Sequence, residues 1–151
     1  MARRIWIDGD SVARPARRLV ERHAGRRGYE LIVVADRPIP LSDEENVSSV
    51  ELESGAEAVD NHLLTHASPG ELVVTRDIPL AEKLLERGVY VLNDRGEEFS
   101  EENIGRRKSE RDMMQLLRES GAVASHGSSY GKADLKSFAD SFDIFLTKRL
   151  H

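Results

Sequence analysis

The chain of 151 residues contains no cysteine and few aromatic residues. Without cysteine it can form no disulfide, no thiolate metal site and no cysteine nucleophile. Aromatic side chains make up 5% of the residues, and most of the four phenylalanines lie near the C-terminus. The sequence therefore shows no obvious surface on which the bases of a single-stranded nucleic acid would stack.

Long apolar runs are also absent. No run approaches the ~18 apolar residues of a membrane-spanning helix. After Met1-Ala2-Arg3-Arg4, only three apolar residues precede Asp8, too few for the apolar core of a signal peptide. We therefore expect a cytoplasmic protein that does not associate with a membrane.

The net charge is −5, from 27 acidic and 22 basic residues, so generic binding of phosphate backbones by a strongly basic surface is not expected. The distribution of charge matters more than its sum, however. Basic residues gather early, at Arg14, Arg17, Arg18, Arg26 and Arg27, and again late, at Arg106, Arg107, Lys108 and Arg111. The simplest interpretation of each cluster is a solvated helix face.

Strand and helix patterns alternate along the chain. Short apolar runs predict strands at 5–7, 31–35, 47–52, 72–75 and 89–92. Apolar stripes at helical spacing predict helices at 12–24, after Gly55, near Pro79, and at about 106–119 and 132–149. The pattern predicts an α/β fold with a mainly parallel central sheet and helices on both faces. The Ser/Gly-rich stretch Gly121–Gly131 is interpreted as a mobile connection.

Acidic residues follow several of the predicted strands. Asp8 and Asp10 follow the first strand, Asp36 the second, Asp77 the fourth and Asp94 the fifth. In a parallel sheet these residues share one edge, where ligands bind in such folds. Each has an ordinary alternative explanation: Asp77 as a helix N-cap, and Asp36 and Asp94 as turn residues.

Asp60 is less easily explained, because helical spacing from Ala56, Leu63 and Leu64 places it beside the core-facing stripe. A carboxylate there needs a hydrogen bond, an ion pair or a bound cation. If it faces Asp8, Asp10 and Asp77, the four would form one acidic pocket. Hard divalent cations such as Mg²⁺ or Mn²⁺ suit oxygen ligands of this kind. His62 and His66, four residues apart, are more simply a solvated or partner-capping pair than metal ligands.

Several segments resemble the YaiI/YqxD family of bacterial proteins. They are Ile5-Trp6-Ile7-Asp8-Gly9-Asp10, the stretch from Gly55 to Asn61, Gly70 to Ala81 with its Thr-x-Asp-Ile-Pro-Leu-Ala core, and Leu92 to Gly96. The likeness continues through Arg111 to Met114 and Leu117 to Gly121. Two positions depart from the family pattern: Ser11-Val12 stands where Cys-Pro is usual, and Asp94 where proline is usual.

That family is similar to PIN-like domains, which hold Mg²⁺ or Mn²⁺ with acidic residues and cut RNA. The resemblance implies a single three-layer PIN-like domain over residues 1–151, with a helical C-terminal segment at about 106–150. It implies catalytic roles for Asp8, Asp60 and Asp77, and metal binding by these three and Asp10. RNA is then the expected partner, with Arg106 and Arg107 available for its phosphates.

Two alternatives remain open. Asp8-Gly9-Asp10-Ser11-Val12 also fits the Asp-x-Asp-x-Val opening of haloacid-dehalogenase-type phosphatases, in which the first aspartate is a nucleophile. No later apolar strand ends in the acidic pair that this class needs. The second alternative is a non-catalytic nucleic-acid or protein binding module with a vestigial acidic site. The negative net charge and the scarcity of aromatics favour it.

Overall fold

The computed structural model describes residues 3–53, 55–122 and 129–149. Its centre is a six-stranded sheet with the order β3-β2-β1-β4-β5-β6. The strands are β1 (Arg3–Asp8), β2 (Tyr29–Ala35), β3 (Val47–Glu51), β4 (Leu72–Val74), β5 (Tyr90–Leu92) and β6 (Glu98–Phe99). The first five strands pair in parallel, and β6 pairs antiparallel with β5.

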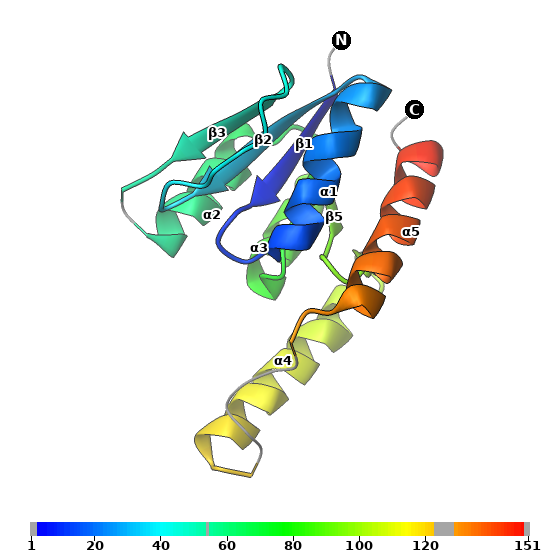
Figure 1. The fold of residues 1–151 in the computed structure, drawn as a ribbon. Helices are drawn as coiled ribbons and strands as arrows, with labels where there is room; N and C mark the ends of the chain where they lie inside the picture. Colours follow the sequence, from blue (N-terminus) through cyan, green and yellow to red (C-terminus); the bar gives the residue numbers. More distant parts are fainter. Residues whose placement is uncertain (1–2, 54, 123–128, 150–151) are drawn as a thin grey trace.

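Helices cover both faces of this sheet. They are α1 (Arg14–Ala24), the 3₁₀ helix η1 (Gly25–Arg27), α2 (Ala56–His66), α3 (Ile78–Glu86), α4 (Ile104–Glu119) and α5 (Lys132–Lys148). In Figure 1, α1 and α5 lie on one face, and α2 and α3 on the other. The expected α/β architecture, with a mainly parallel sheet between two helical layers, is confirmed.

Alternation along β1 divides the core in two. Ile5 and Ile7, both fully buried, pack in the cluster that includes Val20 of α1 and Phe138 of α5. Trp6 points to the other face and packs with residues of α2 and α3. Because successive strand residues face opposite sides, a strand buried on both faces reads as a continuous apolar run, as β1 and β2 do.

Two details differ from the sequence-based expectation. Helix α1 ends at Ala24, as predicted, but Gly25 has a helical φ of −64°, and the turn to positive φ comes only at Gly28. The segment Gly25–Arg27 therefore adds a 3₁₀ turn. The second difference is β6, which pairs through Val91–Phe99 and Leu92–Glu98. With two residues, it is too short to produce a hydrophobic period in the sequence.

Helix α4 extends away from the body of the molecule (Figure 1). Its first residue, Ile104, is buried against the α2–α3 side of the core, whereas Met113, Met114 and Leu116 are exposed. Both C-terminal helices lie close to their expected positions. Of the connection expected at Gly121–Gly131, residues 123–128 lie outside the described residues. Within the described part of the chain, no helix is long and apolar enough to cross a membrane.

Candidate functional site at the carboxyl edge of the sheet

Asp8 is the last residue of β1 and lies at the centre of the candidate site. The neighbouring strand β4 pairs Val74 with Ile7, so Thr75 follows directly beside Asp8. The Thr75 hydroxyl donates to Asp8 Oδ2 at 2.7 Å, and the Ser11 hydroxyl donates to the same oxygen at 2.9 Å. Asp8 is 5% exposed, and Oδ1 of its carboxylate accepts no hydrogen bond from a described residue. Every fully buried side-chain oxygen in the described chain has a hydrogen-bond partner, so Oδ1 must be the oxygen that solvent reaches.

The same threonine connects Asp8 to Asp77. The Asp77 backbone N–H donates to Thr75 Oγ1 at 3.0 Å, so this hydroxyl accepts from one residue and donates to the other. Asp77 is the N-cap of α3, and its Oδ1 accepts from the Leu80 N–H at 3.0 Å. The expected capping role is confirmed, and it leaves Oδ2 of Asp77 without a hydrogen bond.

Asp60 approaches the other two acids from α2. Its side chain is partly buried, as the helical spacing predicted, and neither of its oxygens accepts a hydrogen bond from a described residue. Burial, followed by the negative charges of Asp77 and Asp8, raises the pKa of Asp60 to about 6, and Lys83 opposes this rise. The charges of acids from three elements, β1, α2 and the start of α3, therefore act on one another.

The pKa of Asp8 is also raised. Burial is the largest cause; the hydroxyl hydrogen bonds from Thr75 and Ser11 oppose it, and the charges of Asp77 and Asp10 add to it. A cation would relieve this mutual repulsion, because it favours the charged form of every carboxylate around it. The acidic residues thus form an electrostatically coupled group.

The donor set fits a hard, hydrated cation. Asp8 and Asp77 each offer one carboxylate oxygen that accepts no hydrogen bond, and Asp60 offers two. Throughout residues 3–53, 55–122 and 129–149, no three acidic or histidine side chains stand close enough to form a ready-made metal cage. Mg²⁺ does not need one, since it typically keeps several waters and takes one or two carboxylates.

Asp10 lies at the same edge but is held differently. Its Oδ2 accepts from the Asp36 N–H at 3.0 Å, and its Oδ1 accepts from Arg37 Nε at 3.2 Å. Both oxygens thus bind the loop that follows β2. The charge of Asp10 contributes to the raised pKa of Asp8, while its carboxylate links the turn after β1 to the loop after β2.

Asp94 lies in the turn after β5, as expected, yet its side chain is fully buried. Its Oδ2 accepts from the Ala13 N–H at 2.7 Å and from Arg76 Nε at 2.8 Å. The Tyr130 hydroxyl donates to its backbone carbonyl at 2.7 Å. Asp94 therefore joins the start of α1, the residue before Asp77 and the segment leading to α5.

Arg106 and Arg107, the expected phosphate contacts, lie on α4 and are paired with carboxylates. Glu110 accepts from Arg106 at 2.8 Å and from Arg107 at 2.7 Å. Arg107 also donates to Glu97 at 2.8 Å. Phosphate binding there would have to displace these carboxylates.

The rings of His62 and His66 contact one another at a tilt of 37°, with centroids 4.2 Å apart. Burial and the neighbouring His66 lower the pKa of His62. Trp6 meets His62 edge-on at 6.3 Å. These contacts give the histidine pair a packing role on the α2 side of the sheet.

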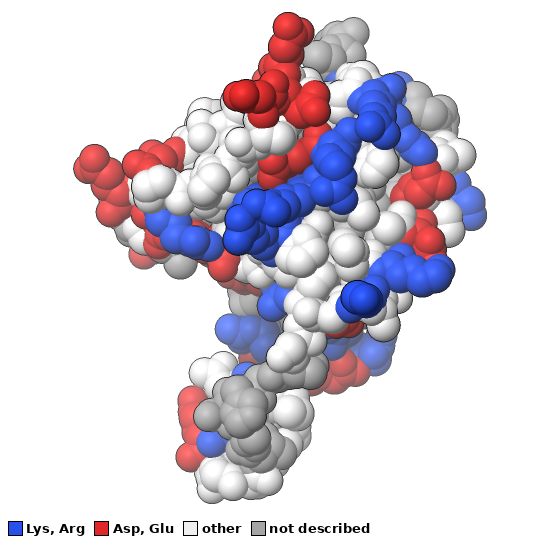
Figure 2. All heavy atoms as spheres, viewed as in Figure 1, with Lys and Arg blue, Asp and Glu red and all other residues white. Residues whose placement is uncertain are grey.

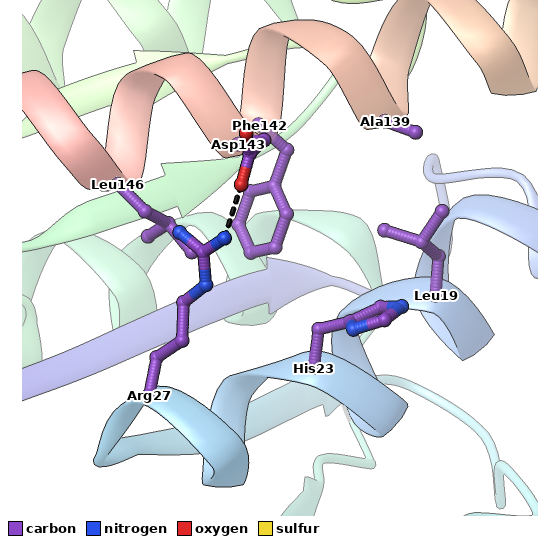
Figure 3. Close-up of a pocket in the computed structure, with 7 residues that line it drawn as sticks. All are labelled: Leu19, His23, Arg27, Ala139, Phe142, Asp143 and Leu146. Atoms are coloured by element: carbon purple, nitrogen blue, oxygen red, sulfur yellow. Dashed lines mark hydrogen bonds and ion pairs between the residues drawn. The ribbon is translucent and has the colours of Figure 1, made fainter.

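A separate pocket of about 220 Å³ lies between α1 and α5. Figure 3 shows Phe142 and Leu146 of α5 facing Leu19 and His23 of α1, with an ion pair from Arg27 to Asp143 across one end. None of the carboxyl-edge acids lines it. The apolar walls make it a seam between two helices.

Sequence reasoning missed the two hydroxyl residues that hold the Asp8 carboxylate in place. Thr75 and Ser11 were not singled out, although each lies within three residues of a candidate acid. A hydroxyl residue directly after a buried strand and two positions before an aspartate is the signal that would have indicated Thr75.

The fold and the site define a class: a three-layer α/β protein with coupled carboxylates at the carboxyl edge of its central sheet. The family model described as "Uncharacterized BCR, YaiI/YqxD family" matches residues 6–148. The chain therefore belongs to the YaiI/YqxD family.

Individual relatives agree over almost the whole length. The chain is 40% identical to a UPF0178 protein of Ectopseudomonas mendocina over 145 residues, which cover 96% of this chain and 97% of the relative. It is 40% identical to a UPF0178 protein of Syntrophobacter fumaroxidans, with 97% and 95% covered. A UPF0178 protein of Myxococcus xanthus is also 40% identical, with 96% and 95% covered. No solved structure matches the chain.

Proposed function

We propose that this protein is a divalent-metal-dependent nuclease that hydrolyses RNA phosphodiesters at Asp8, Asp60 and Asp77. The observation that carries the proposal is the placement of Asp8 and Asp77 around the Thr75 hydroxyl, with Asp60 close enough for their charges to raise its pKa. Each of the three has an oxygen that accepts no hydrogen bond from a described residue. The resemblance to PIN-like domains supports RNA as the substrate. Mg²⁺ or Mn²⁺ matches the hard oxygen donors.

The three acids have different roles in this proposal. Asp8 and Asp77 are held by fixed donors, so their remaining oxygens are oriented before any ligand arrives. Asp60, whose pKa is raised to about 6 in the absence of metal, would return to its charged form when a cation binds between the acids. A bound Mg²⁺ or Mn²⁺ would supply Lewis-acid stabilisation of the charge that develops on the phosphate.

The test is a calorimetric titration with Mn²⁺ of the wild type and of Asp77→Asn. Asparagine is as good an N-cap as aspartate, so the variant keeps the start of α3 while losing the charge. Because loss of even an outer-sphere partner weakens metal binding by about 10–100-fold, loss of a direct ligand should weaken it at least as much. RNA turnover should fall with it.

The matched control is Asp112→Asn, an exposed aspartate on α4. It should bind Mn²⁺ as the wild type does. Equal binding by wild type and Asp77→Asn would remove the proposed site. Intact, site-dependent Mn²⁺ binding without metal-stimulated RNA cleavage would favour the non-catalytic binding module instead.

A second candidate, the phosphatase with Asp8 as nucleophile, is favoured by one observation. The Thr75 hydroxyl lies 2.7 Å from Asp8 Oδ2, so a hydroxyl at the end of the neighbouring strand stands beside the aspartate. Asp10, the second aspartate of the Asp-x-Asp-x-Val opening, has both oxygens engaged by Asp36 and Arg37. We therefore prefer the metal-dependent nuclease.

A further inference from the structure

Four arginines form a continuous row on the outer surface of α1 and η1. This arginine ridge consists of Arg14, Arg18, Arg22 and Arg26, each four residues from the next. All four are exposed, and none makes a hydrogen bond or ion pair with another described residue. Figure 2 shows Lys and Arg side chains gathered in a band over α1.

The other arginines of the same segment are used differently. Arg17 is buried and donates to Glu21 within α1 at 3.0 Å and to the Pro40 carbonyl at 3.3 Å, and Arg27 pairs with Asp143 of α5. These two fasten α1 and η1 to the rest of the fold. The arginines of this segment therefore fall into two groups: those that contact the rest of the protein are paired, and those of the exposed ridge are unpaired among the described residues.

The ridge works against the stability of its own helix. Like charges four residues apart on a helix repel. The first turn of α1 contains no acidic residue that would offset them. Burial, followed by the charges of Arg26, Arg22 and Arg27, lowers the pKa of the nearby His23. A positive potential thus extends along this face of a protein whose net charge is −5.

The spacing fits a polyanion with regularly repeated charges. Four residues of α-helix rise about 6 Å, so the ridge presents cations at intervals comparable to successive phosphates of a nucleic-acid strand. A shallow groove runs beside it, lined by Arg14, Pro15, Arg18, Arg22 and Leu135. At the far end, Arg22 and Arg26 share a second groove with Asp43, Glu44 and Glu45, whose charges would repel a polyanion. We therefore expect a bound polyanion to extend no further than Arg26 at that end of the ridge.

The opposite end of the ridge meets the carboxylate site. Arg14 begins α1, and the Ala13 N–H directly before it bonds Asp94 at 2.7 Å. Asp94 also binds Arg76, the residue adjacent to Asp77. Asp94 therefore links the residue before the first ridge arginine to Arg76, whose side chain is 39% exposed.

We propose that the arginine ridge binds the phosphate backbone of an RNA strand and leads it to the Asp8–Asp60–Asp77 site. The identification of the strand as RNA rests on the proposed function, whereas the ridge itself rests on charge and spacing. Because aromatic residues are scarce, binding is electrostatic and insensitive to sequence. Four phosphate contacts on a single strand correspond to a slope of about −3 in log affinity against log salt.

The experiment measures binding of fluorescent oligouridylate by anisotropy in the presence of EDTA, over a series of salt concentrations. The variant replaces all four ridge arginines by glutamine, which is a good helix former, so α1 should persist and circular dichroism should be unchanged. We expect affinity to fall about tenfold or more, and the salt slope to approach zero as about 0.7 is lost per arginine.

Two controls make the result specific. Arg87→Gln/Arg118→Gln/Lys136→Gln/Lys148→Gln removes the same charge from exposed positions elsewhere and should leave the salt slope near the wild-type value. Replacing the four ridge arginines by lysine keeps the charge and should retain most of the affinity. Because the binding assay contains EDTA, its result does not depend on a bound metal, so failure of the metal site is distinguishable from failure of the ridge.

The proposal is overturned if the wild type does not bind oligouridylate. It is also overturned if the ridge and control variants lose equal affinity. Binding of anionic phospholipid vesicles in preference to the oligonucleotide would likewise overturn it and identify the ridge as a membrane-surface contact.

Discussion

Two helices of this protein are rich in arginine, and the fold treats their charges in opposite ways. On α4, Arg106 and Arg107 share Glu110, and Lys108 reaches Glu82 of α3. On α1 the four ridge arginines have no such partners. The carboxyl-edge acids resemble the ridge in this respect, because they also collect like charges. Charged side chains without an oppositely charged partner in the described chain are therefore concentrated at the two proposed ligand-binding regions. On α4, by contrast, the same sequence pairs its arginines with glutamates.

The largest effect on stability is expected at Asp94, which is bonded both to the residue before the arginine ridge and to the residue before Asp77. Asp94→Ala removes a buried carboxylate that binds both the Ala13 N–H and Arg76. Loss of a buried pair and of a backbone acceptor should lower the free energy of unfolding by about 3 kcal/mol. Urea denaturation measures this change. Asp112→Ala, which removes an exposed pair on α4, should change it by less than about 0.5 kcal/mol. Equal effects would erase the distinction between the two regions.

The second effect concerns the acids. In the metal-free protein, the pKa of Asp60 is raised to about 6 from 3.8, so the folded state binds more protons than the unfolded state between these values. The free energy of unfolding should therefore fall as pH rises through this window. The full shift corresponds to about 3 kcal/mol, which solvent screening of this partly exposed side chain reduces to about 1 kcal/mol.

Denaturant titrations at several pH values, in the presence of EDTA, measure this dependence. Asp60→Asn should flatten it and make the protein more stable above pH 6. Asp112→Asn should leave the slope unchanged. A steeper or reversed slope in Asp60→Asn would show that other groups dominate.

The smallest effect is expected when a ridge arginine is replaced by glutamate, which gives α1 the alternating charges found on α4. Arg18→Glu replaces two repulsions, with Arg14 and Arg22, by two attractions, and should stabilise the protein by about 0.5–1 kcal/mol. The same variant should bind oligouridylate more weakly. Glu110→Arg makes the reverse change on α4, because it removes the partner of Arg106 and Arg107, and should lower the melting temperature. If Arg18→Glu destabilised the fold, the ridge would have a structural role.

The fold followed from the sequence because its strands are continuous apolar runs and its helices have apolar stripes. The parallel arrangement then brought Asp8 and Asp77 to one edge, and helical spacing placed Asp60 beside the core. The burial of Asp94 could not be predicted, since its partner Ala13 lies 81 positions away in the chain. The pairing of Arg106 with Glu110 could have been, because the two residues stand four apart on a predicted helix.

The bond between Asp8 and Thr75 joins residues 67 positions apart, across the central strands β1 and β4. During synthesis, a chain that has emerged as far as α2 already carries Asp8 and Asp60. It still lacks the hydroxyl that orients Asp8 and the helix that Asp77 caps. Because β4 and α3 come from the later part of the chain, the site cannot be complete on the ribosome until more than half of the protein has been made. The carboxylate site therefore forms only after α3 has been synthesised, whereas β1 and α2 are already present.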